Sequence, residues 1–397
     1  MSTNISVSSQ LDKDVLTIAF QGKIDSSNAP ALETEIQKIV AENPASAIVL
    51  DFDGLEYTTS AGLRVILRLR QQVSDTSIIN ASPEVYDILE MTGFTDMMQV
   101  QKAYRVISVE GCEVIGQGAN GKVYRIDPDT IVKVYLSPDA LPEIQREREL
   151  ARTAFVSGLP TAIPYDVVRI KGGGYGSVFE LLNAVSFAKL LASGEKSLDE
   201  IAEMSVSLLK LIHSKTVKPE SMPDMKEIAQ DWAAFLKDYL PAEAFDKLTS
   251  LVDAVPEDLH MMHGDYHIKN VMLQNGESLL IDMDTLCHGH PVFELASMFN
   301  AYRGYSSLDK SVVKDFLGIP YDTAAAFWRR SLELYLDTKE DAKIQAVEDK
   351  AKIIGYTRIM RRAIRRNGMG TEDGRAMIEF CKTNLLELLN RVDSLQF

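Results

Sequence analysis

A glycine-rich stretch and a lysine that follows it are the first residues in this sequence able to do chemistry. Residues 115–123 read Ile-Gly-Gln-Gly-Ala-Asn-Gly-Lys-Val, so that Gly116, Gly118 and Gly121 form the pattern Gly-x-Gly-x-x-Gly-x-Val. Glycines let a backbone close over phosphate groups, and Lys133 supplies a positive point charge to them. These residue types in this order predict a phosphate-binding site.

The first six positions of the same pattern also occur in dinucleotide-binding folds, where a helix follows the glycines directly. Here we expect strands at 123–126 and 130–135, separated by a turn at 127–129 that reads Asp-Pro-Asp. A glycine loop folded between strands, followed by a lysine on a further strand, is the arrangement of kinases. The residues that follow the glycines therefore favour a kinase over a dinucleotide-binding fold.

A glutamate usually holds the strand lysine of a kinase. The next predicted helix, 142–158, offers three candidates, Glu143, Glu147 and Glu149. Glu147 best matches the pattern Arg-Glu-x-acid-apolar of small-molecule kinases, and Glu149 stays open as an alternative. We expect Glu147 to lie beside Lys133.

A second group of reactive side chains lies between residues 260 and 290, where five of the six histidines occur. Their number suggests a metal site, but their spacing argues against zinc. Residues 263–270 form His-Gly-Asp-x-x-x-x-Asn, and 281–284 read Ile-Asp-Met-Asp. Together with the glycine loop, these motifs resemble the aminoglycoside and choline kinase-like phosphotransferases over about residues 104–300.

The resemblance implies an enzyme that uses ATP (or GTP) to phosphorylate the hydroxyl group of a small molecule. Asp265 matches the catalytic base, which takes the proton of the attacking hydroxyl. Asn270 and Asp282 match the pair that holds Mg²⁺, an ion that prefers oxygen ligands. The residues expected to bind the nucleotide are Gly116, Gly118, Gly121, Lys133, Glu147, Glu180 and Leu182.

Other residues near these motifs are expected to support the site. His263 resembles a hydrogen-bonded structural residue of the catalytic loop, and Glu294 stands where the family has an acid that braces this loop. Asp284 is either a second metal ligand or a turn residue. Three further histidines are expected at the surface or in the substrate pocket: His267, His288 and His290.

The elements that position these side chains follow from a turn. Residues 271–281 are expected to form a hairpin around Asn275-Gly276, the strongest two-residue turn signal. Such a turn pairs Asn270 with Ile281, so Asn270 and Asp282 come to the same open end of the hairpin. The turn alone does not tell which way each side chain points.

The first hundred residues alternate strands and helices. Strands are expected at 15–21, 47–52 and 77–81, and helices after Asn28, from about Ser60 and at 83–92. This alternation predicts a small α/β layer.

Residues 4–103 resemble the STAS domain of anti-sigma-factor antagonists, chiefly through Gly-Lys-Ile-Asp-Ser-Ser at 22–27 and Thr-Ser-Ala-Gly-Leu at 59–63. In that family the serine that begins the second helix is a phosphorylation switch, and Ser60 matches its position. The resemblance also implies a partner similar to an anti-sigma factor. A helix N-terminus favours a phosphate, and the alternative is that Ser60 only caps the helix.

Two observations favour a small acceptor over a protein substrate. Protein kinases have a long activation segment after the metal-binding aspartate, whereas Pro291 and Glu294 follow Asp282 closely. Gly264 stands where protein kinases usually have an arginine that contacts this segment. Two alternatives remain, a protein kinase that acts on a STAS serine (Ser60 or that of a partner), and a nucleotide-sensing module without turnover.

The region 301–397 is expected to be mostly helical and to form the substrate side of the pocket. Five arginines share one predicted helix face: Arg358, Arg361, Arg362, Arg365 and Arg366. We expect them to pair with the chain's own acids, such as Glu340, Asp341, Glu348 and Asp349. The alternative is an anionic substrate or an acidic partner. Three acids are expected on a solvated helix face rather than toward a cationic substrate: Asp224, Asp231 and Asp238.

Composition sets the wider limits. The 397 residues carry a net charge of −15, which argues against binding nucleic acid or anionic membranes. We see no membrane-spanning run, no secretion signal and no paired cysteines, so we expect a cytoplasmic protein. The expected fold is an α/β STAS-like regulatory domain (mixed sheet with helices) at 1–103, followed by an α+β bilobal protein-kinase-like fold. Its N-lobe is expected at 104–182 and its helical C-lobe at 183–397.

Overall fold

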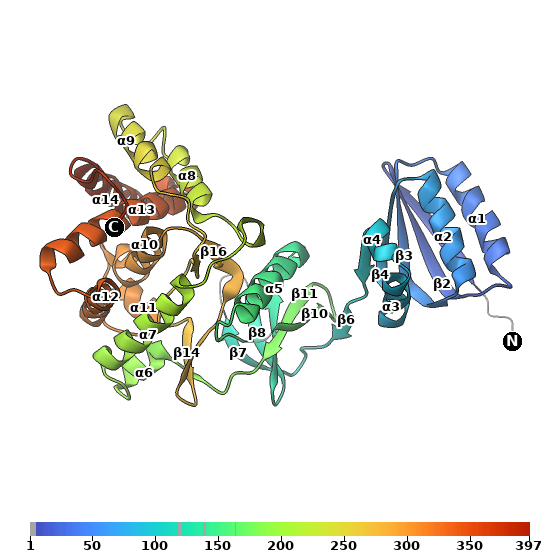
Figure 1. The fold of residues 1–397 in the computed structure, drawn as a ribbon, viewed down its shortest axis with the longest axis horizontal. Helices are drawn as coiled ribbons and strands as arrows, with labels where there is room; N and C mark the ends of the chain where they lie inside the picture. The colour runs from blue at the N-terminus through green and yellow to red at the C-terminus, as the bar shows by residue number, and fades with distance from the viewer. Residues whose placement is uncertain (1–4, 118–120, 138–139, 163) are drawn as a thin grey trace. The chain divides into compact units, whose positions relative to one another are not determined.

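The computed structural model describes residues 5–117, 121–137, 140–162 and 164–397. The chain divides into two units, Met1–Ile107 and Ser108–Phe397 (Figure 1). Each unit has its own buried apolar core.

The first unit contains a mixed five-stranded sheet in the order β1-β2-β3-β4-β5. β1 is antiparallel to β2, and the other neighbouring strands are parallel. Leu16, Ile18 and Phe20 are buried on one face of β2, as the alternation of apolar residues predicts. The strands are β1 (Ser6–Asp12), β2 (Val15–Ile24), β3 (Ala47–Thr58), β4 (Asp75–Ala81) and β5 (Val100–Lys102).

Four helices accompany this sheet: α1 (Ala29–Glu42), α2 (Ser60–Gln72), α3 (Pro83–Met91) and α4 (Phe94–Met97). In Figure 1, α1 and α2 run side by side over the sheet. Pro30 lies in the first turn of α1, where its missing N–H removes no helical hydrogen bond. The Ser82 hydroxyl accepts a hydrogen bond from Val85 N and so begins α3. The predicted α/β layer is therefore confirmed.

The second unit begins with a strand-rich lobe, in which five strands follow the order β10-β11-β9-β8-β7 and each is antiparallel to its neighbours. Helix α5 (Leu141–Val156) packs against β10 and β11. After the glycine-rich stretch the chain continues as strand β8, which confirms the kinase arrangement and excludes the dinucleotide alternative. The strands are β7 (Glu113–Gln117), β8 (Gly121–Asp127), β9 (Thr130–Tyr135), β10 (Pro164–Ile170) and β11 (Tyr175–Glu180), and the short strand β6 (Arg105–Ile107) ends the first unit.

A helical lobe completes the second unit. Its helix α10 is buried from Val292 to Tyr302 and contacts α12 and α13. None of the helices in the described residues is long and apolar enough to cross a membrane. The helices are α6 (Phe187–Ser193), α7 (Leu198–His213), α8 (Met225–Phe235), α9 (Ala242–Asp253), α10 (Pro291–Tyr302), α11 (Ser311–Leu317), α12 (Tyr321–Leu336), α13 (Asp341–Arg365) and α14 (Glu372–Leu389).

The segment between α9 and α10 consists of short strands and turns. The hairpin of β14 and β15 turns at Asn275 and Gly276, whose φ angles of +52° and +86° suit a type I′ turn. Gln274 pairs with Glu277, which confirms the predicted register. The small elements of this lobe are β12 (Val185–Ser186), β13 (Met261–Met262), β14 (Val271–Gln274), β15 (Glu277–Leu280), β16 (Cys287–His288), and the 3₁₀ helices η1 (Pro219–Ser221), η2 (Met283–Thr285), η3 (Gly304–Ser306) and η4 (Gly368–Gly370).

Candidate active site

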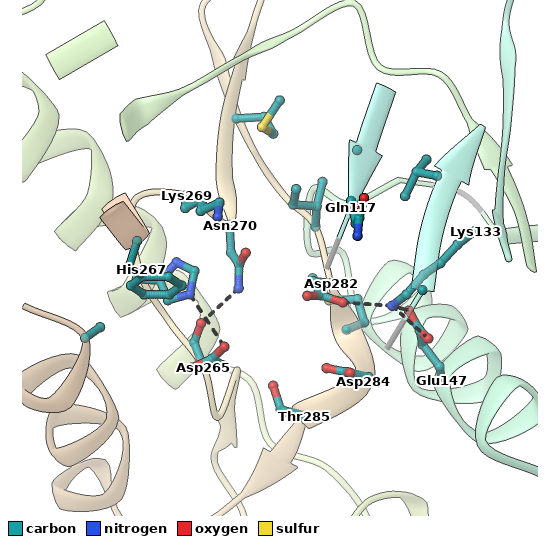
Figure 2. Close-up of a pocket in the computed structure, with 18 of the residues that line it drawn as sticks. Gln117, Lys133, Glu147, Asp265, His267, Lys269, Asn270, Asp282, Asp284 and Thr285 are labelled. Atoms are coloured by element: carbon teal, nitrogen blue, oxygen red, sulfur yellow. Dashed lines mark hydrogen bonds and ion pairs between the residues drawn. The ribbon is translucent and has the colours of Figure 1, made fainter. Parts of the chain in front are cut away.

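Residues from both lobes of the second unit line one large cavity of about 1180 Å³. Figure 2 shows Lys133 and Glu147 across from Asp265 and Asn270, with Asp282 between them. The cavity collects most residues predicted for the site: Gly116, Gly121, Lys133, Glu147, Glu180, Leu182, Asp265, Asn270 and Asp282. Gly118 lies outside the described residues.

Lys133, on β9, lies between two carboxylates. Its Nζ is 2.9 Å from Glu147 Oε1 and 3.0 Å from Asp282 Oδ1. Burial alone would lower the pKa of Lys133, but the charges of Glu147 and Asp282 outweigh it and raise this pKa. Glu143 and Glu149 are exposed instead, and Glu149 pairs with Arg152. The structure thus brings Glu147, and neither alternative, to the lysine.

Tyr135 was missed in the sequence analysis although it belongs to the same cluster. Its hydroxyl donates to Glu147 Oε2. Burial and then the charge of Glu147 raise the pKa of Tyr135 far above the usual range, so it stays a neutral donor. The signal was available, because residues two apart on a strand point to the same face and Tyr135 follows Lys133 by two.

Gly121 allows the backbone of β8 to approach β9 closely. A Cβ added at Gly121 would lie 2.3 Å from Val134 O, so no other residue fits without a shift of the strand. Glu180 and Leu182 line the cavity at the end of β11, where Leu181 N donates to Asp129 O at 2.8 Å. These strands form the wall of the cavity opposite the catalytic loop.

The catalytic loop, residues 263–270, brings Asp265 and Asn270 together. Asn270 Nδ2 donates to the main-chain oxygen of Asp265 at 3.1 Å, and His267 Nε2 is 3.5 Å from Asp265 Oδ2 (Figure 2). Burial alone would raise the pKa of Asp265, but His267, Arg358 and His263 lower it to about 2. Asp265 is therefore ionised at neutral pH and accepts hydrogen bonds only.

Glu294 holds the start of this loop from behind. Its buried carboxylate accepts hydrogen bonds from His263 N at 2.6 Å and Gly264 N at 3.1 Å. His213 Nε2 lies 3.8 Å away on α7. Burial alone would raise the pKa of Glu294, but the nearby charge of His213 lowers it, with help from the charge of His263 and the hydrogen bond from Gly264 N. The position of Glu294 matches the brace predicted for it.

The loop is also tied to the segment that carries Asp282. His263 Nε2 lies 3.2 Å from Ile281 O, and Thr285 Oγ1 donates to His263 O at 2.8 Å. Gly264 has φ +79°, and a Cβ there would lie 2.3 Å from Thr285 O. The close approach of these two segments therefore requires glycine at 264.

Asp282 and Asp284 point into the space between Lys133 and Asp265 (Figure 2). Asp282 has φ +66°, an unusual conformation outside glycine that clusters at functional sites. Burial, followed by the negative charge of Asp282, raises the pKa of Asp284. The negative charge around Asp284 therefore outweighs the positive charge of Lys133. Carboxylate oxygens beside the amide oxygen of Asn270 are the ligands that Mg²⁺ prefers.

Several expectations about other residues are wrong. His288 and His290 are buried away from the cavity, where His288 Nδ1 bonds Asp258 O and His290 Nδ1 accepts from Val292 N. Only His267 of this trio lines the cavity. Ser60 is not the cap of α2, since Thr59 takes that position and Ser60, in the first unit, is exposed in the first turn.

The predicted pairing of the α13 arginines with nearby acids is also wrong. Among the described residues, none of Arg358, Arg361, Arg362, Arg365 and Arg366 forms an ion pair, because cations at other positions hold those acids. Glu340 pairs with Lys343, Asp341 with Arg329, Glu348 with Lys352 and Arg303, and Asp349 with Arg391. Asp231 and Asp238 are exposed, as predicted, whereas Asp224 is the N-cap residue of α8.

Two family models match the chain. The model of the phosphotransferase enzyme family (APH) matches residues 111–327, and that of the STAS domain matches residues 6–107. A putative anti-sigma factor antagonist of Bordetella bronchiseptica, BtrV, is 34% identical over 90 residues, which are 22% of this chain and 77% of that protein.

Two solved structures can be aligned with this chain at low sequence identity. The aminoglycoside phosphotransferase APH(4)-Ia is 14% identical with a TM-score of 0.48, over 70% of this chain and 94% of that chain. A choline/ethanolamine kinase family protein of Mesorhizobium loti is 15% identical with a TM-score of 0.44, over 70% of this chain and 87% of that chain. The phosphotransferase match spans more than half of the chain and includes the catalytic loop and Lys133. The chain therefore belongs to the phosphotransferase enzyme family, whose members transfer phosphoryl groups to hydroxyl acceptors, and it carries a STAS domain before that enzyme domain.

Proposed function

We propose that the second unit transfers the γ-phosphoryl group of ATP (or GTP) to the hydroxyl of a small molecule. The observation that carries this proposal is the convergence of Lys133, Glu147, Asp265, Asn270 and Asp282 on one cavity. We assign the nucleotide to the lobe at 104–182 and the acceptor to the lobe at 183–397. The STAS-like domain, predicted at 1–103, is the regulatory domain.

Asp265 acts as the catalytic base in this proposal. It lies in the cavity as an ionised carboxylate, and it orients the acceptor hydroxyl and takes its proton as the oxygen attacks phosphorus. Lys133 supplies positive charge to the α- and β-phosphates while Glu147 holds its ammonium in place. Glu180 and Leu182 flank the base of the nucleotide at the end of β11.

Asn270 and Asp282 are the residues we assign to Mg²⁺, with Asp284 as a further carboxylate beside them. Asn270 Nδ2 donates to Asp265 O, so Oδ1 is the amide atom left for a cation. Proteins commonly hold Mg²⁺ with one or two carboxylates together with phosphate oxygens of the substrate. The ion would neutralise charge on the transferred group.

A small acceptor is favoured over a protein by the length of the chain after Asp282. The short helix η2 and strand β16 occupy the residues before α10 begins at Pro291. A protein substrate needs a docking segment at this position, and these residues are already paired with β13 or packed against α5.

The test is turnover by the purified full chain with Mg-ATP and a library of hydroxylated compounds. Mass spectrometry of the products is expected to show one added phosphoryl group on a subset of the library. Absence of any phosphorylated product, with a residual ATP hydrolysis equal in Asp265→Asn, would contradict the proposal and favour a nucleotide sensor without turnover.

Lys133→Met is expected to raise the KM for ATP about 10–100-fold, because a charge-assisted contact to phosphate is lost. The substitution also leaves Glu147 buried without its ammonium partner, so thermal stability should fall. Steady-state kinetics at saturating acceptor measure the first effect. Lys171→Met, at an exposed turn position, is the matched control. If the KM for ATP is unchanged in Lys133→Met, Lys133 does not bind the nucleotide.

We propose that the STAS domain binds a protein similar to an anti-sigma factor and that Ser60 is its regulatory phosphosite. Similarity to anti-sigma factor antagonists and the exposed position of Ser60 at the N-terminus of α2 support this. We expect Ser60 to stay unmodified when the chain alone is incubated with Mg-ATP. Phosphopeptide mapping checks this, and stoichiometric phosphate that disappears in Asp265→Asn would instead identify a protein kinase.

A further inference from the structure

Three arginines line the cavity on the side of the helical lobe: Arg358, Arg362 and Arg366. They are four residues apart and therefore follow one another about every 6 Å along one face of α13, with Arg366 just beyond its end. Arg358 is nearest to the catalytic loop, since its Nη1 lies 3.5 Å from Gly264 O. We call these three residues the arginine row.

Neutral groups, rather than acids, contact Arg358 and Arg362 of the arginine row. Arg358 Nη1 donates to Ser297 Oγ at 3.0 Å, and its guanidinium carbon lies 5.2 Å from the ring centre of Trp232. Arg362 Nη1 donates to the Tyr305 hydroxyl at 3.3 Å, and its guanidinium carbon is 5.2 Å from that ring. No carboxylate of the described chain forms an ion pair with the row. Arg358 is near enough to Asp265 to help lower the pKa of that carboxylate, which leaves Arg362 and Arg366 for an anion in the cavity.

Such guanidinium groups favour anions. Stacking on an aromatic ring restrains a guanidinium without using all its N–H donors, and those donors match carboxylate and phosphate oxygens. The carboxylates that line the cavity lie elsewhere, on the nucleotide side or in the catalytic segments: Glu147, Glu180, Asp265, Asp282 and Asp284. The part of the cavity along α13 is therefore cationic in a chain whose net charge is −15.

Helix α11 adds an apolar wall to the same cavity through Val312, Val313 and Phe316. The ring of Phe316 packs against His267 of the catalytic loop, with 4.9 Å between ring centres. The 3₁₀ helix η3, which carries Tyr305, contacts both α11 and α13. The apolar wall is thus linked to the catalytic loop at one end and to the arginine row at the other.

We infer that the acceptor is a small hydroxylated anion, whose carboxylate or phosphate binds Arg362 and Arg366 and whose carbon skeleton lies along α11. This inference rests on the proposed function, because it names the substrate class of the same site. In the transfer, the acceptor oxygen bonds to the γ-phosphorus and the bond from this phosphorus to the leaving ADP oxygen breaks. The hydroxyl proton passes to the Asp265 carboxylate.

The test uses the full chain and matched sets of hydroxylated compounds, in which one skeleton carries a neutral group, an amine, a carboxylate or a phosphate. Transfer from Mg-ATP is followed by mass spectrometry, and binding is followed by calorimetry with a non-hydrolysable ATP analogue. We expect the carboxylate or the phosphate member to bind and react best, and the better of the two identifies the anionic group.

Arg362→Gln is expected to raise the KM for that anionic acceptor about 10–100-fold while the KM for ATP stays unchanged. Arg365→Gln is the matched control, because Arg365 is exposed on the same helix and does not line the cavity. Increased salt should weaken acceptor binding in the wild type more than in Arg362→Gln.

The other possible outcomes distinguish the inference of an anionic acceptor from the proposed phosphotransferase function. The inference is wrong if the enzyme transfers the phosphoryl group preferentially to neutral or amine compounds. It is also wrong if Arg362→Gln lowers transfer to all compounds equally. Both results leave the proposed function unaffected. Binding of an anionic compound that is never phosphorylated supports the inference and contradicts the proposed function. If none of the small anions binds, the inference is wrong. Binding of a polyglutamate peptide through Arg362 would then assign the arginine row to an acidic protein partner.

Discussion

Asp265→Asn is expected to lower kcat by about 10²–10⁴-fold, the usual contribution of a positioned general base. Asparagine keeps the size and one acceptor oxygen of the side chain, but it cannot take the hydroxyl proton. Asn270 contacts only the main-chain oxygen of Asp265, so the substitution should leave the loop in place. The KM for ATP is therefore expected to stay unchanged. Initial rates with the best acceptor of the library measure the loss.

Asp238→Asn is the matched control, since Asp238 is an exposed aspartate of the same lobe. If Asp265→Asn keeps more than one tenth of the wild-type rate, another group is the base. The pH dependence gives a second check. Because the pKa of Asp265 is lowered to about 2, this group stays ionised throughout the neutral range. We therefore expect that protonation of Asp265 causes no fall in wild-type kcat between pH 8 and pH 5. Any fall in kcat over this range should be the same in wild type and in Asp265→Asn.

Glu294→Ala is expected to destabilise the second unit by about 3–5 kcal/mol, the range found when one partner of a buried charged pair is removed. The substitution leaves His263 N and Gly264 N without their acceptor and deprives His213 of a nearby negative charge. In a domain of this size, each kcal/mol lowers the melting temperature by roughly 2–4 °C. Calorimetry of the full chain measures the shift.

Glu379→Ala, on the exposed face of α14, controls for the loss of a carboxylate. A change in stability no larger than that control would mean that the loop does not depend on Glu294. The folded-state pKa of Glu294 is lowered, so the ionised group contributes its full stability above its ordinary pKa of about 4.3. This contribution is lost as the pH falls through the folded-state pKa. The difference between wild type and Glu294→Ala should therefore shrink in acid.

The parts of the site that local signals determine could be predicted from the sequence. The turn at Asn275-Gly276 determines the register of its hairpin, and the structure confirms that register, with Ile281 N donating to Asn270 O. The two strands that follow the glycines, β8 and β9, are determined by the turn at 127–129 that separates them. In both cases a few adjacent residues decide the outcome, so tertiary packing has little to change.

Features that depend on distant contacts were harder to predict. Glu143, Glu147 and Glu149 lie on one helix, and only the packing of α5 against the strands selects Glu147. The arginines of α13 were expected to pair with acids of the same region, yet Arg329, on α12, and Arg391, just after α14, take two of those acids. A sequence shows which charges exist but not which of them meet after folding. His288 and His290 became buried for the same reason.

One end of α13 is attached to the catalytic machinery and the other is not. Arg358 is fixed at Gly264 and Ser297, whereas Arg366, just past the end of the helix, lies about 12 Å farther along its axis. Because an α-helix has a constant rise per residue, α13 fixes the distance between the anion-binding arginines and the catalytic loop. This distance sets how far the anionic end of an acceptor lies from the hydroxyl that reacts at Asp265. Compounds with the same charge but a shorter or longer skeleton should therefore be rejected by length alone.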